Sequence, residues 1–144
     1  MTGSPSGPHE AARPHRRVVL GLGVDLCEVP RVERAVFRHG DRFLSRVFRE
    51  GELRRPRSAP GFAEHAAGLF AAKEAAMKAL GTGLRGVAFR EVAITRAPGG
   101  PPRLALYGRA AARAAALGAG AAHVTITHTR EMAAAVVLLL AAGE

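Results

Sequence analysis

Apolar residues follow a strand-like pattern near the start of the chain and a helical pattern in its middle. Residues 18–26 are almost all Val, Leu or Gly, which predicts a buried strand whose glycines admit a close neighbouring backbone. From Phe62 to Leu80 apolar residues recur every three or four positions, which predicts one helix about 28 Å long. Gly81 is expected to end this helix, because glycine readily adopts the left-handed conformation that follows a last helical turn.

Two shorter helices are expected between these segments. Residues 28–39 carry apolar side chains at helical spacing, and Pro30 is tolerated in a first helical turn. Residues 50–54 predict a short helix that Pro56 closes. The inner face of the first of these helices is expected to consist of Val29, Val32, Val36 and Phe37.

The second half of the chain predicts four strands and one helix. Residues 91–95 and 103–106 flank a turn rich in proline and glycine, which predicts a β-hairpin. An alanine-rich helix is expected over residues 108–117, followed by strands over 123–129 and 132–140 that a tight turn joins. Together with the first strand, these elements predict an α+β fold with an antiparallel sheet.

The ordered part of the chain is expected to form one domain, residues 17–144. Residues 1–16 contain three prolines and no hydrophobic period, which predicts a disordered tail. No apolar run approaches the roughly 20 residues of a membrane span, and the apolar segment of a secretory signal is missing. We therefore expect a cytoplasmic protein that makes no membrane contact.

The net charge of +9 indicates a negatively charged partner, such as nucleic acid, an acidic protein or a phosphate-rich small molecule. Much of this charge comes from arginines at helical spacing, with Phe43 among them. These arginines either form a solvated surface or dock an acidic helix or a phosphate backbone. The single cysteine, Cys27, excludes an intrachain disulfide and a cysteine-rich zinc site. The arginine series consists of Arg31, Arg34, Arg38, Arg42 and Arg46.

Four polar side chains occupy positions that indicate chemistry. Asp25 ends an apolar strand, where a carboxylate is costly to bury unless it is paired or binds a cation; the alternative is a helix cap or a turn. Glu74 and Lys78 share one helix face and form either an exposed salt bridge or a grip on a metal ion and a phosphate. His128 lies in a threonine-rich strand, where it either binds phosphate or makes a structural hydrogen bond.

Three motifs occur in unbroken order over residues 20–140, and together they resemble one family. They are Gly23-Val24-Asp25, the run F-x-x-K-E-x-x-x-K from Phe70 to Lys78 with its Gly-Thr-Gly exit, and Thr125–Thr129. Each motif is weak alone, whereas the combination is specific. The chain resembles the holo-[acyl-carrier-protein] synthases, the small trimeric class of 4′-phosphopantetheinyl transferases. The resemblance implies an antiparallel sheet packed on a long central helix.

The resemblance also implies a reaction and the residues that perform it. Such enzymes transfer 4′-phosphopantetheine from coenzyme A to a serine of apo acyl carrier protein, releasing adenosine 3′,5′-bisphosphate, and so activate the carrier for fatty-acid or polyketide synthesis. Asp25 and Glu74 match the Mg²⁺ ligands of the family, and Glu74 also matches the group that orients or deprotonates the serine. Lys78 matches the lysine that stabilises charge on the pyrophosphate. Two carboxylates suit Mg²⁺, which takes few protein ligands besides phosphate and water.

Other positions match the family's coenzyme A site and its carrier-protein surface. The matches near the phosphates and adenosine of coenzyme A are Lys73, Gly81, Thr127, His128 and Thr129. The matches on the surface that docks the acidic carrier protein are Arg31, Arg38, Arg42, Phe43 and Arg46. The resemblance further implies a homotrimer with active sites between its subunits.

The chain departs from the family pattern in three places. Leu69 stands where the family often has arginine, which removes one expected phosphate contact. The segment 31–46 is longer than usual by about one residue, which shifts the register of Arg38 and His39 against their counterparts. The arginine-rich loop 54–57 has no counterpart in the family pattern.

Two other functions agree with parts of the sequence. A small basic nucleic-acid-binding module would explain the charge, but aromatic residues for base stacking are scarce and no nucleic-acid motif is present. A protein that keeps the fold without turnover is the second alternative, and the intact set of Asp25, Glu74 and Lys78 argues against it.

Overall fold

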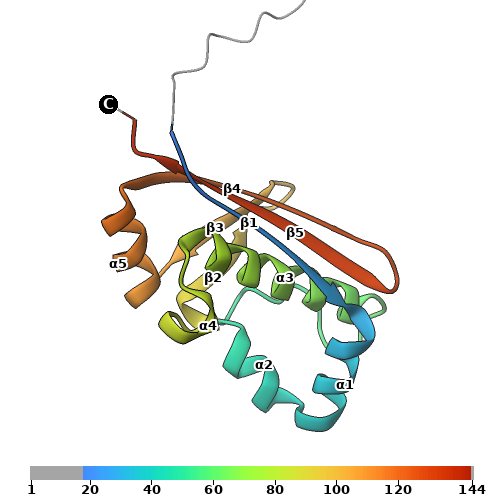
Figure 1. The fold of residues 1–144 in the computed structure, drawn as a ribbon. Coiled ribbons are helices and arrows are strands. Elements are labelled where there is room, and N and C mark those ends of the chain that lie inside the picture. The colour runs from blue at the N-terminus through green and yellow to red at the C-terminus, as the bar shows by residue number, and fades with distance from the viewer. Residues whose placement is uncertain (1–17, 144) are drawn as a thin grey trace, which may run out of the picture.

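A 19-residue helix, α3 (Phe62–Leu80), lies against a three-stranded sheet at the centre of the computed structural model, which describes residues 18–143 (Figure 1). The strands are β1 (Val19–Glu28), β2 (Val92–Arg96), β3 (Pro102–Leu106), β4 (Ala119–His128) and β5 (Met132–Ala141). The other helices are α1 (Val29–His39), α2 (Asp41–Val47), α4 (Gly83–Gly86), α5 (Gly108–Leu117) and the 3-10 turn η1 (Phe89–Glu91). The expected disordered tail, residues 1–16, lies outside the described residues.

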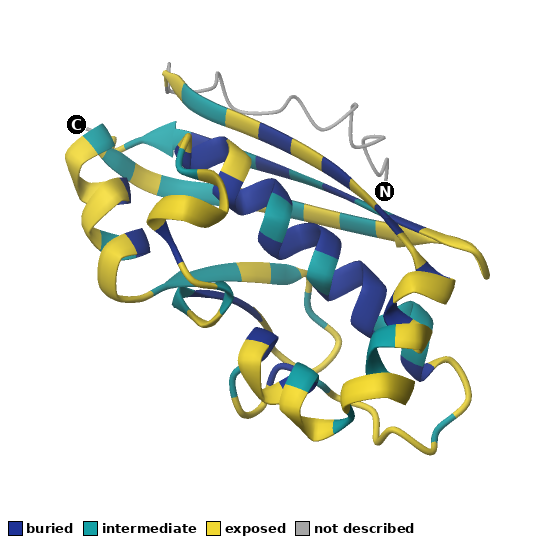
Figure 2. Ribbon diagram, turned by 60° about the horizontal axis from the view of Figure 1, so that its bottom comes forward, coloured by how far each residue is buried: buried dark blue, intermediate teal, exposed yellow. Residues whose placement is uncertain are grey.

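Two antiparallel sheets lie on opposite sides of α3 (Figures 1 and 2). The larger sheet has the order β1-β5-β4, with β5 in the middle, and the β2-β3 hairpin forms the smaller sheet. Val136 of β5 is paired with Val24 on one side and with Thr125 on the other. The predicted antiparallel sheet on a long central helix is confirmed, as are the hairpin and the alanine-rich helix α5.

Strand β1 packs on α3 with almost no side-chain volume between the two backbones. A Cβ atom added to Gly23 would overlap the carbonyl oxygen of Ala75, and one added to Gly21 would overlap that of Ala79. The facing positions of α3 are alanines that are fully or almost fully buried. Larger side chains at these positions would push strand and helix apart, so this contact requires glycine opposite alanine.

The sequence prediction of a buried first strand is only half right. The residues of β1 that point toward α3, such as Asp25 and Cys27, are buried, whereas Leu22, Val24 and Leu26 are 64%, 56% and 65% exposed (Figure 2). The physical reason is that β1 is an edge strand with α3 on one face only, and successive side chains of a strand point to opposite faces.

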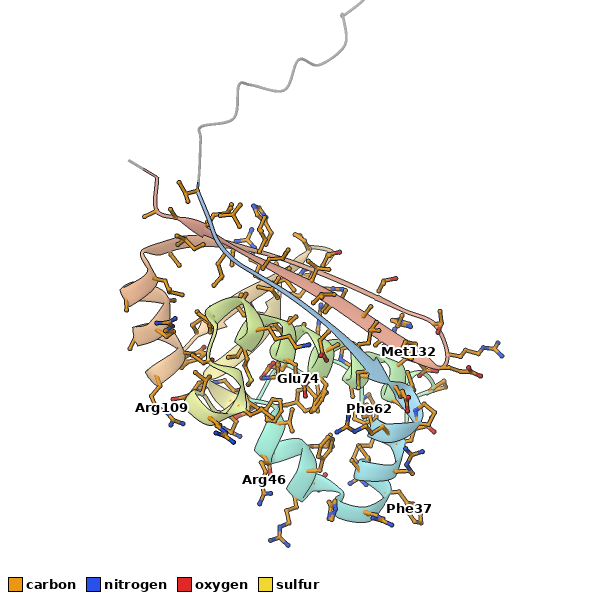
Figure 3. The ribbon with its side chains drawn as sticks, viewed as in Figure 1. Phe37, Arg46, Phe62, Glu74, Arg109 and Met132 are labelled. Atoms are coloured by element: carbon orange, nitrogen blue, oxygen red, sulfur yellow. The ribbon has the colours of Figure 1, made fainter. Side chains whose placement is uncertain are left out.

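Two expectations for the helices are wrong. Phe37 of α1 does not face the protein core but is 91% exposed (Figure 3). Val36 packs against the core, and the next residue of a helix is turned by about 100°, which directs Phe37 to solvent. Residues 50–54 form no helix. The carboxylate of Glu52 instead holds this segment by accepting hydrogen bonds from the backbone N–H of Arg49 (2.7 Å) and of Ile94 (3.0 Å).

A buried ion pair joins α3 to this loop and corrects the prediction that Lys73 contacts coenzyme A. The Lys73 ammonium is fully buried and donates to Glu52 Oε1 at 2.7 Å and to the carbonyl oxygens of Phe89 (3.1 Å) and Val92 (2.6 Å). These three bonds use all three ammonium donors, so none is available to a phosphate. Burial lowers the pKa of Lys73, and the hydrogen bond that its ammonium donates to Glu52 opposes that shift.

We predict that Lys73→Met destabilises the protein by about 3–5 kcal/mol, because it leaves the buried Glu52 carboxylate without its countercharge. Urea unfolding measures this free energy. The matched control is Arg57→Gln, which removes an ion pair of similar length, 3.0 Å to Asp41, whose side chains are 47% and 88% exposed. This control should cost under about 1 kcal/mol. Equal losses for the two variants would refute the structural role of Lys73.

Candidate active site

The close contact between β1 and α3 brings Asp25 beside Lys78 and Glu74. Lys78 Nζ donates to Asp25 Oδ1 at 3.0 Å and to the carbonyl oxygen of Val24, also at 3.0 Å. The ion pair of Lys78 is therefore made with Asp25 of the neighbouring strand. The salt bridge between Lys78 and Glu74, one of the two alternatives for this helix face, is not formed among the described residues. The carboxylate of Asp25 is nearly buried, whereas the Lys78 side chain is 55% exposed. The cluster of Asp25, Glu74 and Lys78 is therefore open to solvent at Lys78.

The two carboxylates of this group lie close enough to affect each other. Burial raises the pKa of Glu74, and the negative charge of the neighbouring Asp25 raises that pKa further. The charges of Arg31 and Lys78 oppose the shift. A pair of carboxylates with this mutual repulsion favours either a shared proton or a bound cation.

One oxygen of Asp25 has no partner. Within residues 18–143, Asp25 Oδ2 is the one buried side-chain oxygen or nitrogen without a hydrogen bond. A buried carboxylate oxygen in this state is costly unless a ligand satisfies it. The described residues contain no group of three acidic, histidine or cysteine side chains placed for a metal. A pair of carboxylates nonetheless fits Mg²⁺, which binds proteins through one or two carboxylates and completes its shell with phosphate and water.

Cys27 lies on the same face of β1, two residues beyond Asp25. Burial raises the pKa of its thiol to about 11, with Glu74, Asp25 and Glu28 adding to the shift and Arg31 opposing it. A thiol with a raised pKa carries little thiolate at neutral pH, which disfavours Cys27 as a nucleophile.

Gly81 ends α3, as the sequence predicted, in the left-handed conformation with φ of 75°. Its backbone N–H donates to the carbonyl oxygen of Lys78 at 3.0 Å, so the turn begins directly at the base of that lysine. Arg113 of α5 donates from Nε to the Leu80 carbonyl oxygen at 2.9 Å and adds a positive charge at this helix end. Arginine is favourable there because the helix dipole is negative at its C-terminus.

The residues of the motif Thr125–Thr129 are divided between the two faces of the larger sheet. His128 and Thr129 line a cavity of about 570 Å³ that is bounded by the first half of α3, the ends of β2 and β4 and the loop before α3. Thr127 instead pairs with Ala134 and is exposed on the outer face. The Thr129 hydroxyl accepts the backbone N–H of Glu131 and of Met132, which holds the β4–β5 turn.

Sequence reasoning missed most of the cavity. The cavity is strongly basic, but its cationic residues lie far apart in the chain. His65, which also lines it, belongs to none of the sequence motifs. The composition of loop 54–57 is rich in arginine, and only the tertiary structure brings this loop beside His128. The cavity does not include Asp25, Glu74 or Lys78. Its positively charged lining residues are Arg54, Arg55, Arg96 and Arg130, and His65 and His128 also line it.

The arginines expected to dock a carrier protein are exposed on α1 and α2. Gly40 separates the two helices, so these arginines belong to two short faces instead of one. Arg46 points away from the body of the protein (Figure 3). Phe43 is half-buried and packs on Phe70 with 6.4 Å between the ring centroids, so it supports α2 from inside.

No helix among residues 18–143 is both long enough and apolar enough to cross a bilayer. This finding concerns the described helices alone.

Comparison with known proteins gives one consistent family. The family model described as the 4′-phosphopantetheinyl transferase superfamily matches residues 21–137. The holo-[acyl-carrier-protein] synthases of Solidesulfovibrio magneticus and Koribacter versatilis are 51% and 45% identical to this chain over 123 residues, which is 85% of this chain and 98% of each relative. A solved holo-(acyl-carrier-protein) synthase from Bacillus anthracis, described as a complex with coenzyme A, superposes with a TM-score of 0.69 at 31% identity, covering 86% of this chain and 98% of that one. This chain therefore belongs to the 4′-phosphopantetheinyl transferase superfamily, among the holo-[acyl-carrier-protein] synthases.

Proposed function

We propose that this protein transfers the 4′-phosphopantetheine group of coenzyme A to a serine hydroxyl of apo acyl carrier protein, with Mg²⁺, in the cytoplasm. The serine oxygen forms a bond to the phosphorus that carries pantetheine, the pyrophosphate bond breaks, and adenosine 3′,5′-bisphosphate leaves with the bridging oxygen. The observation that carries the proposal is the state of the nearly buried Asp25 carboxylate. One of its oxygens accepts a hydrogen bond from Lys78, the other has no partner, and Glu74 lies close enough for the two negative charges to repel each other.

Asp25 and Glu74 are the residues that would hold Mg²⁺. Once bound, the ion would neutralise charge on the pyrophosphate of coenzyme A. The unpartnered oxygen of Asp25 and the repulsion between the two carboxylates both support this assignment, because a divalent cation removes both costs. Glu74, the more accessible of the two, would also orient the attacking serine and accept its proton, directly or through water.

Lys78 would stabilise the leaving bisphosphate. Its ammonium is half-exposed and is held by Asp25 and by the Val24 carbonyl oxygen, so its position is set before the substrate binds. A preorganised cation beside a transferring phosphoryl group lowers the barrier without rearrangement. Gly81, His128, Thr127 and Thr129 remain proposed contacts of coenzyme A, and Lys73 is removed from that set.

The exposed arginines of α1 and α2 would dock the carrier protein, whose acidic helix complements them. Arg31, Arg38, Arg42 and Arg46 fit this role because they are exposed, and Phe43 supports the helix on which two of them lie. Arg31 is also near enough to Glu74 to affect its pKa, so the docking surface is continuous with the carboxylates. Such charges act mainly by steering and orienting the partner.

The outer face of the larger sheet supports a homotrimer with shared active sites. Leu22, Val24 and Leu26 of β1 are exposed, and Val136 and Leu138 of β5 adjoin them in the paired register. A continuous exposed apolar face of this kind marks an interface. The basic cavity does not include the carboxylates of its own chain, so a second subunit would complete the site.

We predict that Glu74→Gln lowers kcat by roughly 100-fold or more, because the group that orients the serine and one metal ligand are lost together. The mass of apo acyl carrier protein incubated with coenzyme A and Mg²⁺ measures transfer, and EDTA should abolish it. The same variant should raise the melting temperature of the metal-free protein, because a neutral side chain avoids the repulsion from Asp25. Glu50→Gln, in an exposed turn, is the control and should change neither quantity. Unchanged transfer by Glu74→Gln would refute the assignment.

We predict that Arg42→Glu raises the KM for apo acyl carrier protein roughly tenfold while leaving the KM for coenzyme A unchanged, because it repels the acidic partner alone. Steady-state kinetics with each substrate varied in turn measures the two constants. Arg103→Glu, at an exposed position of β3, makes the same charge change away from the docking surface. Equal effects on both substrates would rule out the docking role.

Salt-sensitive RNA binding by a wild-type protein without transfer activity would favour the nucleic-acid alternative.

We predict that Leu22→Asp converts the protein to monomers and abolishes transfer, because a carboxylate on the apolar sheet face blocks subunit contact. Light scattering measures the mass, and the control Leu84→Asp alters a leucine on α4 that is similarly exposed, at 60%. A monomeric mass for active wild-type protein would overturn the interfacial site.

A further inference from the structure

Lys78 leaves only one oxygen of the Asp25 carboxylate available to a ligand. The lysine ammonium donates to Asp25 Oδ1 at 3.0 Å, whereas Asp25 Oδ2 is the one buried side-chain oxygen or nitrogen of residues 18–143 that has no hydrogen bond. Asp25 as a whole is only 9% exposed, so Oδ2 is shielded from bulk water as well. A cation that binds this carboxylate would therefore meet a single free oxygen.

The backbone around Asp25 has little freedom to present the carboxylate differently. Asp25 is paired with Ala135 in the larger sheet. Two residues earlier, Gly23 lies directly on the Ala75 carbonyl oxygen of α3, where a Cβ atom would not fit. Glu74 immediately precedes Ala75 on that helix. The two carboxylates are thus carried by elements whose backbones are in contact, and close-packed contacts of this kind resist rearrangement.

Two acceptors on neighbouring residues of β1 fix the position of the Lys78 ammonium. It donates to the carbonyl oxygen of Val24 at 3.0 Å in addition to Asp25. An ammonium has three donors, so one remains for the phosphate that the proposed reaction assigns to Lys78. Lys78 can therefore keep its bond to Asp25 while a substrate is bound.

The number of free carboxylate oxygens affects which divalent cation a site accepts. Mg²⁺ requires nearly octahedral geometry and is held by one or two carboxylates together with phosphate and water, whereas Ca²⁺ takes about six to eight oxygens and often both oxygens of one carboxylate. A carboxylate with one oxygen bonded to lysine does not offer both oxygens to a cation. The arrangement at Asp25 therefore meets the requirement of Mg²⁺ and falls short of that of Ca²⁺.

We propose that Lys78 restricts Asp25 to binding through one oxygen, so that the site it forms with Glu74 selects Mg²⁺ over Ca²⁺. Lys78 is then a positioning residue for a metal ligand, in addition to its proposed contact with the phosphate. The inference rests on the proposed function, since it takes Asp25 and Glu74 as the ligands of Mg²⁺.

Competition for bound Mn²⁺ tests the selectivity in the absence of both substrates. Mn²⁺ accepts the same oxygen ligands as Mg²⁺, and its electron paramagnetic resonance signal distinguishes free from bound ion, so displacement by Mg²⁺ or by Ca²⁺ gives their relative affinities. The wild-type protein should favour Mg²⁺. Lys78→Met keeps the length of the side chain but removes the donor, and it should reduce this preference roughly tenfold, chiefly by strengthening Ca²⁺ binding, since residues bonded to metal ligands change metal affinity about 10–100-fold.

Arg31→Gln is the matched control that separates the hydrogen bond from the charge. Arg31 is a second cation whose charge acts on Glu74, but it makes no ion pair with Asp25 among the described residues. Removing either cation reduces the repulsion of a bound metal, which strengthens Mg²⁺ and Ca²⁺ binding alike. Arg31→Gln should therefore leave the preference unchanged. Equal strengthening of both ions in Lys78→Met, or a wild-type protein that binds Ca²⁺ as tightly as Mg²⁺, would overturn the proposal.

Thermal unfolding in EDTA checks that Lys78→Met is folded, as expected for a side chain that is half-exposed. Lys78→Ala is the second variant, and it should lose the same preference because it also lacks the donor. A preference for Mg²⁺ that depends on Lys78, in a protein that transfers no phosphopantetheine, would support this inference and refute the proposed function. Transfer activity in a protein whose Mn²⁺ is displaced equally by Mg²⁺ and Ca²⁺ would refute the selectivity alone.

Discussion

Direct contact between the backbones of β1 and α3 is the constraint on which the rest of this structure depends. Gly21 and Gly23 leave no room for a Cβ atom against Ala75 and Ala79, so strand and helix approach as closely as their main chains permit. That short separation places the Asp25 carboxylate within hydrogen-bond distance of Lys78 and near enough to Glu74 to raise its pKa. It also leaves the outer side chains of β1 uncovered, because α3 occupies only one face of the sheet.

Charge of opposite sign is distributed over two separate regions of the subunit. The carboxylates of Asp25 and Glu74 lie between β1 and α3, where they are suited to a cation. The guanidinium groups line a cavity between α3, the strand ends and the loop before the helix, where they are suited to an anion. A substrate that carries both a metal-binding pyrophosphate and a separate phosphate would use the two regions together. The proposed trimer would supply each from a different subunit.

Lys73 and Lys78 show how far a motif determines function. Both belong to the same run of residues, and both are flanked by alanine and good helix formers. Lys73 points into the core, where Glu52 and two carbonyl oxygens use all its donors. Lys78 lies more than a turn further along the helix, at the edge of β1, and keeps a half-exposed ammonium. The direction of each side chain follows from what packs on α3, which the spacing within the helix alone does not contain.

The sequence by itself determined the elements and the family. Hydrophobic period, glycine positions and turn composition predicted α3, α5, the hairpin and the long strands, because these depend on local preferences and on which face must be buried. The motifs around Asp25, Glu74 and His128 indicate the superfamily without any knowledge of where their side chains lie.

Only the tertiary structure decided that Lys78 pairs with Asp25, that Lys73 is structural and that residues 50–54 are held by Glu52 instead of forming a helix. It also assembled the arginines of loop 54–57, β2 and the β4–β5 turn into one cavity. The physical reason is that each of these features joins residues from distant segments, and such contacts depend on the packing of strands and loops around α3.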